Sequence, residues 1–286
     1  MASLRQIRQR MKAIHNIHGI TKAMGMIATF RFKRAENRFS RSRSYFQELE
    51  KMVGNLAAAA GEELKHPLFE DRKIKCKALV VMTGDKGLCG AYNSNLLRAA
   101  QTWMNENAAF SPVLIPVAKV GFEFCRWKRV ATMLGYPEKA LVDLSLGKKV
   151  TLELKELYLS GKVDSVEILY ASYRPGTPGR NKLMPFLGLS YLVKDAKAAQ
   201  GADYIYEPDF EAVFSSALER YLEGKIYMTL LESLTSESSA RMLAMKQATD
   251  NAEDVLDNLK LLRNKTRQAT ITRELSEIVG GASVLV

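Results

Sequence analysis

Residues 245–269 read MKQATDNAEDVLDNLKLLRNKTRQA, and this stretch decides the fold that the sequence predicts. Small and apolar residues recur in it at alternating steps of three and four, which is the spacing of a coiled-coil seam. The seam positions are Met245, Ala248, Ala252, Val255, Leu259, Leu262, Thr266 and Ala269. The stretch predicts a long helix that packs along a second helix, and we expect it to stop at Gly280-Gly281.

Proline shows where the second helix can lie. The first proline is Pro67 and the last is Pro208, so both ends of the chain lack proline. Because proline breaks a helix interior, these two ends can form long helices. The N-terminal end repeats the seam spacing at Leu4, Ile7, Met11, Ile14, His18, Thr21, Gly25 and Ala28. We therefore expect a helix in residues 1–66 to pair antiparallel with a helix in residues 209–286.

The segment between the two helices, residues 67–208, is predicted to be an α/β domain. Continuous apolar runs predict buried strands, and helical patterns lie between them. The expected strands are residues 76–83, 113–118, 165–173 and 182–193, and the expected helices are residues 93–107, 121–134 and 148–160. This order indicates a mostly parallel sheet with an antiparallel edge. The predicted fold is therefore α/β, with a Rossmann-like domain inserted between the two halves of an antiparallel coiled coil.

Positive charge is concentrated at the N-terminus. The chain has a formal net charge of +11, and residues 1–47 contain eleven basic residues but only one acid, Glu36. The basic residues are Arg5, Arg8, Arg10, Lys12, Lys22, Arg31, Lys33, Arg34, Arg38, Arg41 and Arg43. A one-sided field indicates an acidic partner, and nucleic acid is the default candidate. The alternative is a solvated face, although such faces usually mix both signs.

No catalytic constellation is visible in the sequence. The turn at residues 84–90 spaces its glycines as G-x-x-G-x-x-G, which is neither the dinucleotide fingerprint nor a P-loop, so we expect a tight turn in which Asp85 caps backbone donors. The three histidines, His15, His18 and His66, lie on the N-terminal segment. Cys76, Cys89 and Cys125 lack metal-ligand spacing and suit reduced thiols. We predict no cofactor, no metal site, no signal peptide and no membrane span.

Three motifs resemble the gamma subunits of F-type ATP synthases. They are residues 20–28 (ITKAMGMIA), residues 84–93 (GDKGLCGAYN) and residues 241–252 (RMLAMKQATDNA), and the last continues in the family's style through residues 264–279. They occur in order over essentially the whole chain. The length resembles the bacterial form, without the cysteine-bearing insertion of the chloroplast form. Five residues depart from the family's usual residues, namely Gly19, Gly25, Phe30, Phe32 and Gly84. These departures affect the expected stiffness of the coiled coil and the packing around Met24.

The resemblance implies a central rotor shaft without an active site of its own. Such a shaft couples ion-driven rotation of the membrane c-ring to the conformational cycle of the catalytic beta subunits. The implied partners are three alpha and three beta subunits for each copy of this chain, together with an epsilon subunit and the c-ring, and no nucleic acid. The implied location is peripheral, on the cytoplasmic face of the bacterial inner membrane.

The resemblance also implies three groups of contact residues. The contacts to beta subunits are Lys22, Met24, Arg31, Lys33, Arg34, Arg241, Gln268 and Thr272. The residues implied in an apolar sleeve at the tip are Ile278, Val279, Val284 and Leu285. The residues implied at the foot, against the c-ring and the epsilon subunit, are Tyr204, Tyr206 and Glu207.

A second hypothesis is a basic coiled-coil module that binds nucleic acid and uses the α/β domain as a scaffold. The basic N-terminus supports both hypotheses, whereas the three ordered motifs and the apolar C-terminal end support only the shaft. The two also differ in salt dependence, because binding to a phosphate backbone weakens steeply as salt rises. An enzyme is a distant third reading.

Overall fold

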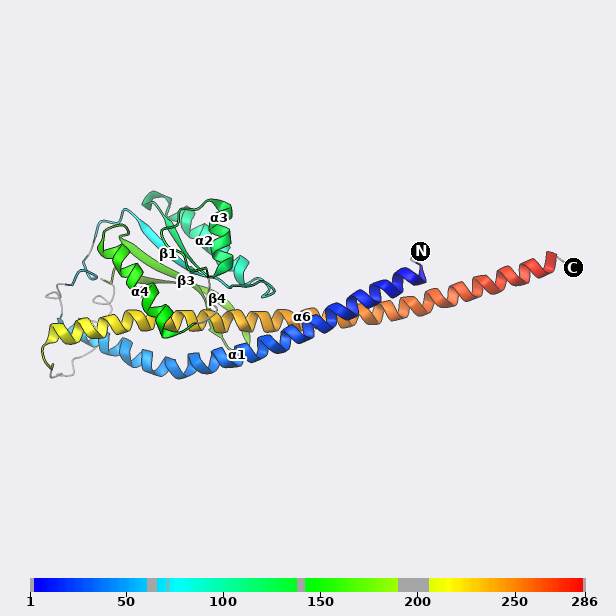
Figure 1. Cartoon of the computed structure of the whole chain (residues 1–286), viewed down its shortest axis with the longest axis horizontal. Helices are drawn as coiled ribbons and strands as arrows, with labels where there is room; N and C mark the ends of the chain where they lie inside the picture. The colour runs from blue at the N-terminus through cyan, green and yellow to red at the C-terminus, as the bar shows by residue number, and fades with distance from the viewer. Residues whose placement is uncertain (1–2, 61–65, 71, 138–141, 190–205, 285–286) are drawn as a thin grey trace. The chain divides into compact units, whose positions relative to one another are not determined.

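The computed structural model describes residues 3–60, 66–70, 72–137, 142–189 and 206–284. The chain divides into two compact units, which are residues 1–29 with residues 241–286, and residues 30–240. Two long helices, α1 (Leu4–Ala60) and α6 (Phe210–Val284), each contribute to both units (Figure 1). These units have other boundaries than the predicted division into residues 1–66, 67–208 and 209–286, and that division remains a prediction.

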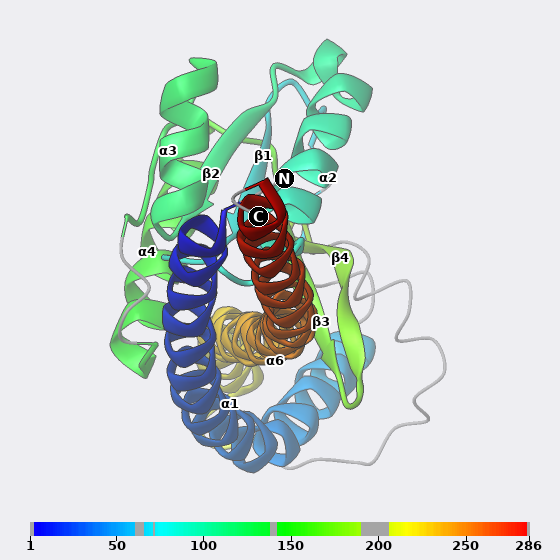
Figure 2. The ribbon, with the colours of Figure 1, turned by 90° about the vertical axis from the view of Figure 1, so that its right-hand side faces the viewer.

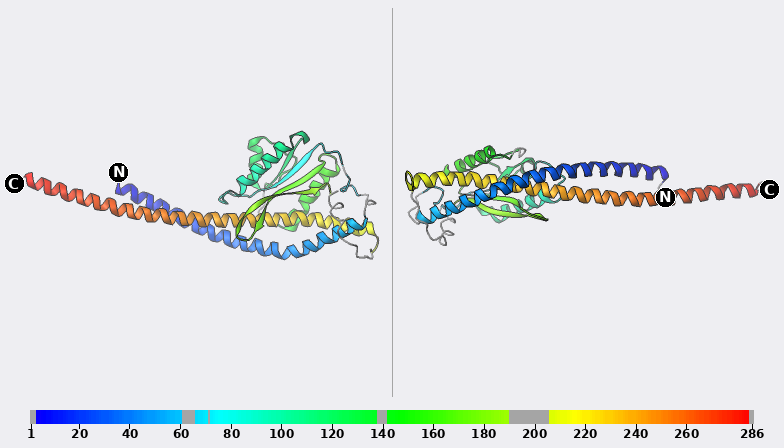
Figure 3. Two further views of the ribbon diagram at one scale, coloured as in Figure 1. Left: turned by 180° about the vertical axis from the view of Figure 1, so that it is seen from behind. Right: turned by 90° about the horizontal axis from the view of Figure 1, so that it is seen from below.

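The unit formed by the two chain ends is an antiparallel helix pair, as predicted. Thr249 Oγ1 donates a hydrogen bond to Thr21 Oγ1 over 3.0 Å, and Gly25 faces Met245. Contact positions therefore rise along one helix as they fall along the other, and the helices run side by side in both views of Figure 3. The residues of the expected N-terminal seam are buried or half-buried.

The expected C-terminal seam is wrong at alternate positions. Val255 and Leu262 are 42% and 44% exposed, and Ala269 is exposed as well. The structure instead half-buries the next residues along the chain, which are Leu256, Arg263 and Thr270. After Ala252 the observed seam moves four residues, to Leu256, whereas the predicted seam moved three, to Val255. Both residues are apolar, so the spacing alone could not show which of them faces the partner helix.

The expected end of the C-terminal helix is also wrong. α6 continues through Gly280-Gly281 to Val284. Glycine lowers helix stability without forbidding the helix, so two glycines do not by themselves end it.

The unit of residues 30–240 contains the predicted sheet. Its strands are β1 (Lys77–Met82), β2 (Val113–Val117), β3 (Ser165–Arg174) and β4 (Thr177–Leu187), in the order β2-β1-β3-β4 (Figure 2). β1 is parallel to β2 and β3, and β4 is antiparallel to β3. The mostly parallel sheet with an antiparallel edge is therefore confirmed.

The described helices that lie wholly within this unit are α2 (Tyr92–Glu106), α3 (Lys119–Lys128) and α4 (Leu144–Leu159), with a 3-10 turn at Ala108–Phe110. α3 ends earlier than expected because Arg129 adopts a left-handed backbone with φ of 52°. β4 begins inside the expected loop, since Pro175 and Gly176 form a two-residue turn with Gly176 at φ +73°. Residues of the expected last strand beyond Leu189 lie outside the described residues.

Both faces of the sheet are buried. Alternate residues of β1 point to opposite sides, so Leu79 and Val81 pack with α2 and α3 while Val80 and Met82 pack with the other core cluster. That second cluster contains residues of α1, α4 and α6 within the same unit. Phe46 of α1 stacks on Tyr221 of α6 with ring centroids 5.7 Å apart. The second face of the sheet is therefore covered by helices from both ends of the sequence.

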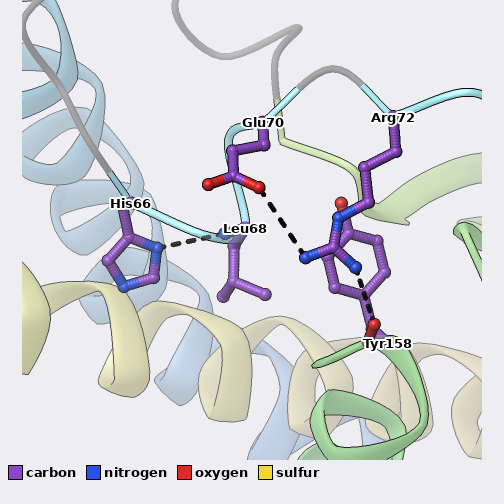
Figure 4. Close-up of polar contacts among 5 residues, drawn as sticks. All are labelled: His66, Leu68, Glu70, Arg72 and Tyr158. Carbon is purple, nitrogen blue, oxygen red and sulfur yellow. Dashed lines mark hydrogen bonds and ion pairs between the residues drawn. The ribbon is translucent and has the colours of Figure 1, made fainter. Parts of the chain in front are cut away.

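His66, Leu68, Glu70 and Arg72, which lie between α1 and β1 in the sequence, make a small set of polar contacts (Figure 4). Arg72 donates to the Tyr158 carbonyl over 2.9 Å, and its guanidinium lies 4.6 Å from the centroid of the Tyr158 ring. The Leu68 amide donates to His66 Nδ1 over 3.3 Å, and the His66 ring contacts Phe214 edge-on. Burial, helped by the positive charge of Lys155, lowers the pKa of His66 below its ordinary value of 6.5.

Replacing Gly25 with alanine is expected to stabilise the helix pair. An added Cβ would lie 3.5 Å from Met245 Cβ, an ordinary van der Waals distance, and alanine is favoured over glycine by about 1 kcal/mol in a helix. Amide hydrogen exchange in residues 15–28 of the full chain should slow by about fivefold. Gly19→Ala is the matched control, since an added Cβ there meets nothing within 4 Å. Faster exchange in Gly25→Ala alone would mean that this position requires glycine.

Stability is expected to fall in mild acid because of His66. Its pKa in the folded chain lies below the ordinary value, so protonation favours the unfolded chain. The contribution of His66 is present above pH 6.5 and is lost as the pH falls from 6.5 through the folded-state pKa. Urea midpoints between pH 7.5 and 5 should fall less for His66→Asn than for the unchanged protein. His15→Asn, an exposed position on α1, should follow the unchanged protein.

Candidate functional site

Four of the predicted contact residues on α1 present their charges to solvent. Lys22 is exposed in the unit of the chain ends, and Arg31, Lys33 and Arg34 are exposed in the unit of residues 30–240. Within the described ranges, no ion pair joins any of these four side chains to an acid. Met24 is half-buried. The exposed positive charge is therefore available to a partner.

The one acid of the basic segment is held by a tyrosine. Tyr173 of β3 donates its hydroxyl to Glu36 Oε1 over 2.6 Å, and the ring of Tyr173 meets Phe32 edge-on at 5.6 Å. Burial, followed by the bond to Glu36, raises the pKa of Tyr173 to about 12. Glu36 is consequently engaged with the sheet, and sequence reasoning could not have found this contact because the two residues lie far apart in the chain.

Arg38 differs from the other basic residues of the segment. It is half-buried, and it donates to the Val142 carbonyl over 2.6 Å and to the Tyr227 hydroxyl over 3.3 Å. These bonds connect α1 to α6 and to Val142, two residues before the start of α4. Arg38 therefore supports the fold, whereas the count of positive charges in the sequence had treated it like its neighbours.

The predicted beta-subunit contacts on α6 lie in the unit of the chain ends. Arg241 is half-buried, whereas Gln268 and Thr272 are exposed, and the Thr272 hydroxyl donates to the Gln268 carbonyl over 3.0 Å. Together with the positions on α1, the predicted beta-subunit contacts are thus divided between the two units. The structure does not bring them into one described site.

The end of α6 presents exposed apolar side chains. Ile278 and Val279 are each 68% exposed, and their contact with a sleeve remains a prediction. Ile271 and Leu275 are exposed too, and with Ile278 they follow the steps of four and three that place residues on one helix face. Sequence reasoning did not include Ile271 and Leu275, although this spacing signals them. The side chain of Val284 and the whole of Leu285 lie outside the described residues.

The predicted foot is partly described. Tyr206 is half-buried with its ring against Phe210, at a centroid distance of 5.1 Å, and Glu207 is exposed. Glu207 lines an open pocket of about 400 Å³ together with Met52 of α1 and Arg220 of α6. Tyr204 lies outside the described residues. The structure thus adds Met52 and Arg220 to the candidate foot.

The remaining candidates for chemistry are structural. The Asp85 carboxylate accepts from the backbone amide of Lys119, the first residue of α3, over 3.4 Å, so one backbone donor that it caps lies outside its own turn. The three cysteines form no disulfide with one another, and burial raises the pKa of Cys125 to about 11. In the described ranges, histidine, cysteine and acidic side chains form no group of three that could hold a metal ion. A larger open pocket of about 660 Å³, between α2 and β4, contains none of the predicted residues.

Within the part of the chain that the structure describes, no helix has both the length and the apolar character that crossing a bilayer requires.

The sequence is similar to one family along nearly all of its length. A family model described as ATP synthase matches residues 3–285. Proteins named ATP synthase gamma chain are 36% identical in Polynucleobacter asymbioticus, 38% identical in Acidovorax sp. and 35% identical in Desulfitobacterium hafniense. In each comparison the match covers 100% of this chain and 100% of the relative.

Solved structures share the fold. A chain from the mitochondrial ATP synthase of Euglena gracilis (OSCP/F1/c-ring, rotational state 3) gives a TM-score of 0.70 at 16% identity, covering 99% of this chain and 94% of that one. A chain from the central stalk/c-ring structure of the Tetrahymena thermophila enzyme gives a TM-score of 0.61 at 22% identity, covering 80% of this chain and 99% of that one. At these identities the similarity supports the fold alone.

Removing the Tyr173 hydroxyl is expected to destabilise the unit of residues 30–240. Tyr173→Phe deletes a hydrogen bond to a carboxylate, which is worth about 1.5 to 3 kcal/mol. Both tryptophans, Trp103 and Trp127, lie in this unit, so the urea midpoint followed by tryptophan fluorescence reports its unfolding. Tyr45→Phe, at an exposed tyrosine of α1, is the control and should leave the midpoint unchanged. Equal urea midpoints for the two variants would show that the contact between Tyr173 and Glu36 adds nothing to the stability of this unit.

Proposed function

This chain belongs to the ATP synthase gamma chain family, and we propose that it is the central rotor shaft of an F-type ATP synthase. In this role it couples rotation of a membrane c-ring to conformational change in catalytic beta subunits and performs no chemistry itself. Its partners are three alpha and three beta subunits, an epsilon subunit and the c-ring. Its place is peripheral, on the cytoplasmic face of the bacterial inner membrane.

The observation that carries this proposal is the exposed apolar face at the end of α6. Ile271, Leu275 and Ile278 lie on one face of the helix and are all exposed in the isolated chain. A row of large apolar side chains in water marks a surface that a partner covers. A sleeve formed by a ring of subunits would cover these side chains while still allowing the helix to turn.

The exposed charges of α1 supply the second part of the mechanism. A shaft drives a conformational cycle only if it makes different contacts with different states of its partner. Arg31, Lys33 and Arg34 offer positive charge on one segment of α1, and an acidic segment of a beta subunit is the complementary surface. As the shaft turns, each beta subunit would meet this charge in turn and lose it again.

The foot is the third part. Glu207, Met52 and Arg220 line one open pocket, to which both long helices contribute. A pocket with an apolar side chain and both signs of charge suits a protein surface better than a small ligand. We assign this surface, with Tyr206 and Tyr204, to the c-ring and the epsilon subunit.

Nucleic-acid binding is the alternative that the basic segment supports. A native mass measurement tests both functions on the complex recovered with the tagged chain from its own membranes after mild detergent extraction. One copy of this chain with three alpha and three beta subunits is expected, and this composition should persist in high salt. A chain recovered alone, or with nucleic acid that nuclease or high salt removes, would overturn the shaft and favour the alternative.

Charge reversal at Lys33 is expected to impair coupling. Lys33→Glu would replace attraction to an acidic partner with repulsion. We therefore expect the rate of ATP synthesis by energised membrane vesicles to fall about tenfold, which corresponds to a free-energy change of ~1.4 kcal/mol. Lys51→Glu is the matched control, because Lys51 is also an exposed lysine of α1 but pairs with Glu48 over 2.7 Å. Lys51→Glu should lower the rate of ATP synthesis by less than about twofold. Equal losses in the two variants would contradict the assigned surface.

A further inference from the structure

The sheet has a strand order at which α/β proteins ordinarily bind ligands. β1 pairs with β2 on one side and with β3 on the other, and the chain leaves β1 toward β2 but leaves β3 toward β4. The strand order therefore reverses at the carboxyl ends of β1 and β3. In open α/β sheets the ligand lies in the crevice at that reversal.

In this protein α6 lies at the crevice. The Tyr173 amide, in the last part of β3, donates to Glu232 Oε1 of α6 over 3.1 Å. At the end of β1, Ser233 Oγ of α6 donates to the Met82 carbonyl over 3.3 Å. The contacts reach both strands that form the crevice, so one helix occupies the position of a ligand.

The side chains that α6 places there are polar and buried. Ser233 and Ser236 are buried, and Glu237 is only 5% exposed. The hydroxyl of Tyr92, at the start of α2, lies 2.8 Å from Ser233 Oγ and also donates to the Ser233 carbonyl over 3.1 Å. Burying polar groups is costly unless their partners are well placed, so this contact favours one arrangement of helix and sheet over its neighbours.

Two glycines allow the close approach. A Cβ on Gly84, in the turn after β1, would lie 2.8 Å from the Glu237 carboxylate. A Cβ on Gly179 of β4 would collide with Ser236 Oγ. In contrast, a Cβ on Gly87 would meet nothing within 4 Å. The glycine at position 84 thus allows the Glu237 carboxylate of α6 to lie against the turn after β1.

We propose that α6 replaces a bound ligand in this crevice, and that Gly84, Tyr92, Ser233 and Glu237 form the contact through which the α/β domain transmits torque to the shaft helix. We call these four residues the crevice contact. Apolar side chains alone can slide past one another into similar arrangements, whereas hydrogen bonds and a buried carboxylate fix one register. The inference rests on the proposed function, and it assigns these residues a positioning role without chemistry.

Gly84→Ala in the assembled complex tests the crevice contact. The added methyl meets the far end of the Glu237 side chain, so it should displace the carboxylate without unfolding the domain. The readout is the ratio of ATP-driven membrane potential to ATP hydrolysis in inverted vesicles, which reports pumping whichever ion is carried. We expect the ratio to fall at least threefold while hydrolysis persists. Gly87→Ala is the matched control and should give the same ratio as the unsubstituted chain.

A double-mutant cycle tests whether the effect runs through Glu237. If Gly84 and Glu237 act through their contact, Gly84→Ala should change the ratio much less in a Glu237→Ala background. Tyr92→Phe, which removes only a hydroxyl, is the milder second variant, and it decides the outcome if Gly84→Ala fails to enter the complex. We expect it to lower the ratio as well.

Two results would overturn the inference. One is a parallel fall of hydrolysis and potential at a constant ratio, which would make the contact merely structural. The other is additive effects of Gly84→Ala and Glu237→Ala, which would separate the two residues. Failure of the proposed function appears differently, because the unchanged chain would then not be recovered with alpha and beta subunits at all.

Discussion

The packing of α6 into the core of the α/β domain is the interaction on which the rest of this structure depends. Phe214, Leu218, Tyr221, Leu222 and Ile226 are almost completely buried, and they belong to the same core cluster as β1, β3 and α1. Near its other end the same helix leaves Ile271, Leu275 and Ile278 in solvent. One continuous helix is thus both the covering layer of a sheet and an exposed rod. The helix cannot leave the core without exposing these apolar side chains, so a movement of the sheet must carry this part of α6 with it.

Much of the fold could be predicted because it depends on local patterns. The apolar runs of β1 and β2, the helix after the turn at residues 84–90 and the two long proline-free helices are visible in the chain itself. The errors arose where two local solutions were nearly equal. Val255 and Leu256 are both apolar, so the seam could take either, and the turn at Gly176 shortened an expected loop. The path through Gly280-Gly281 shows the same limit, since a weak helix former does not decide where a helix stops.

The candidate surfaces could be predicted less well, for a physical reason. Exposure of Lys33 or Ile278 follows from a helix pattern, but what covers each residue is fixed by a partner whose sequence is not in this chain. Contacts within the chain were equally hidden when they joined distant segments. Glu36 with Tyr173, Arg38 with Val142 and Gly84 with Glu237 each connect parts of the sequence that no local pattern relates. Gly84 is the clearest case, because its sequence context suggested only a turn, whereas in the structure the side chain of Glu237 from a distant helix lies against it.

The order of synthesis gives the core cluster a further consequence. One face of the sheet is covered by residues from both ends of the chain, including Leu49 and Val53 of α1 and Phe214 and Leu230 of α6. Ribosomes make the chain from its N-terminus, so β1 to β4 exist before the helix that covers them. Until residues 210–240 emerge, Val80, Met82 and Ile168 have no complete cover and expose an apolar sheet face to solvent. The growing chain therefore passes through a stage at which chaperones would be expected to bind it, and that stage ends when α6 docks.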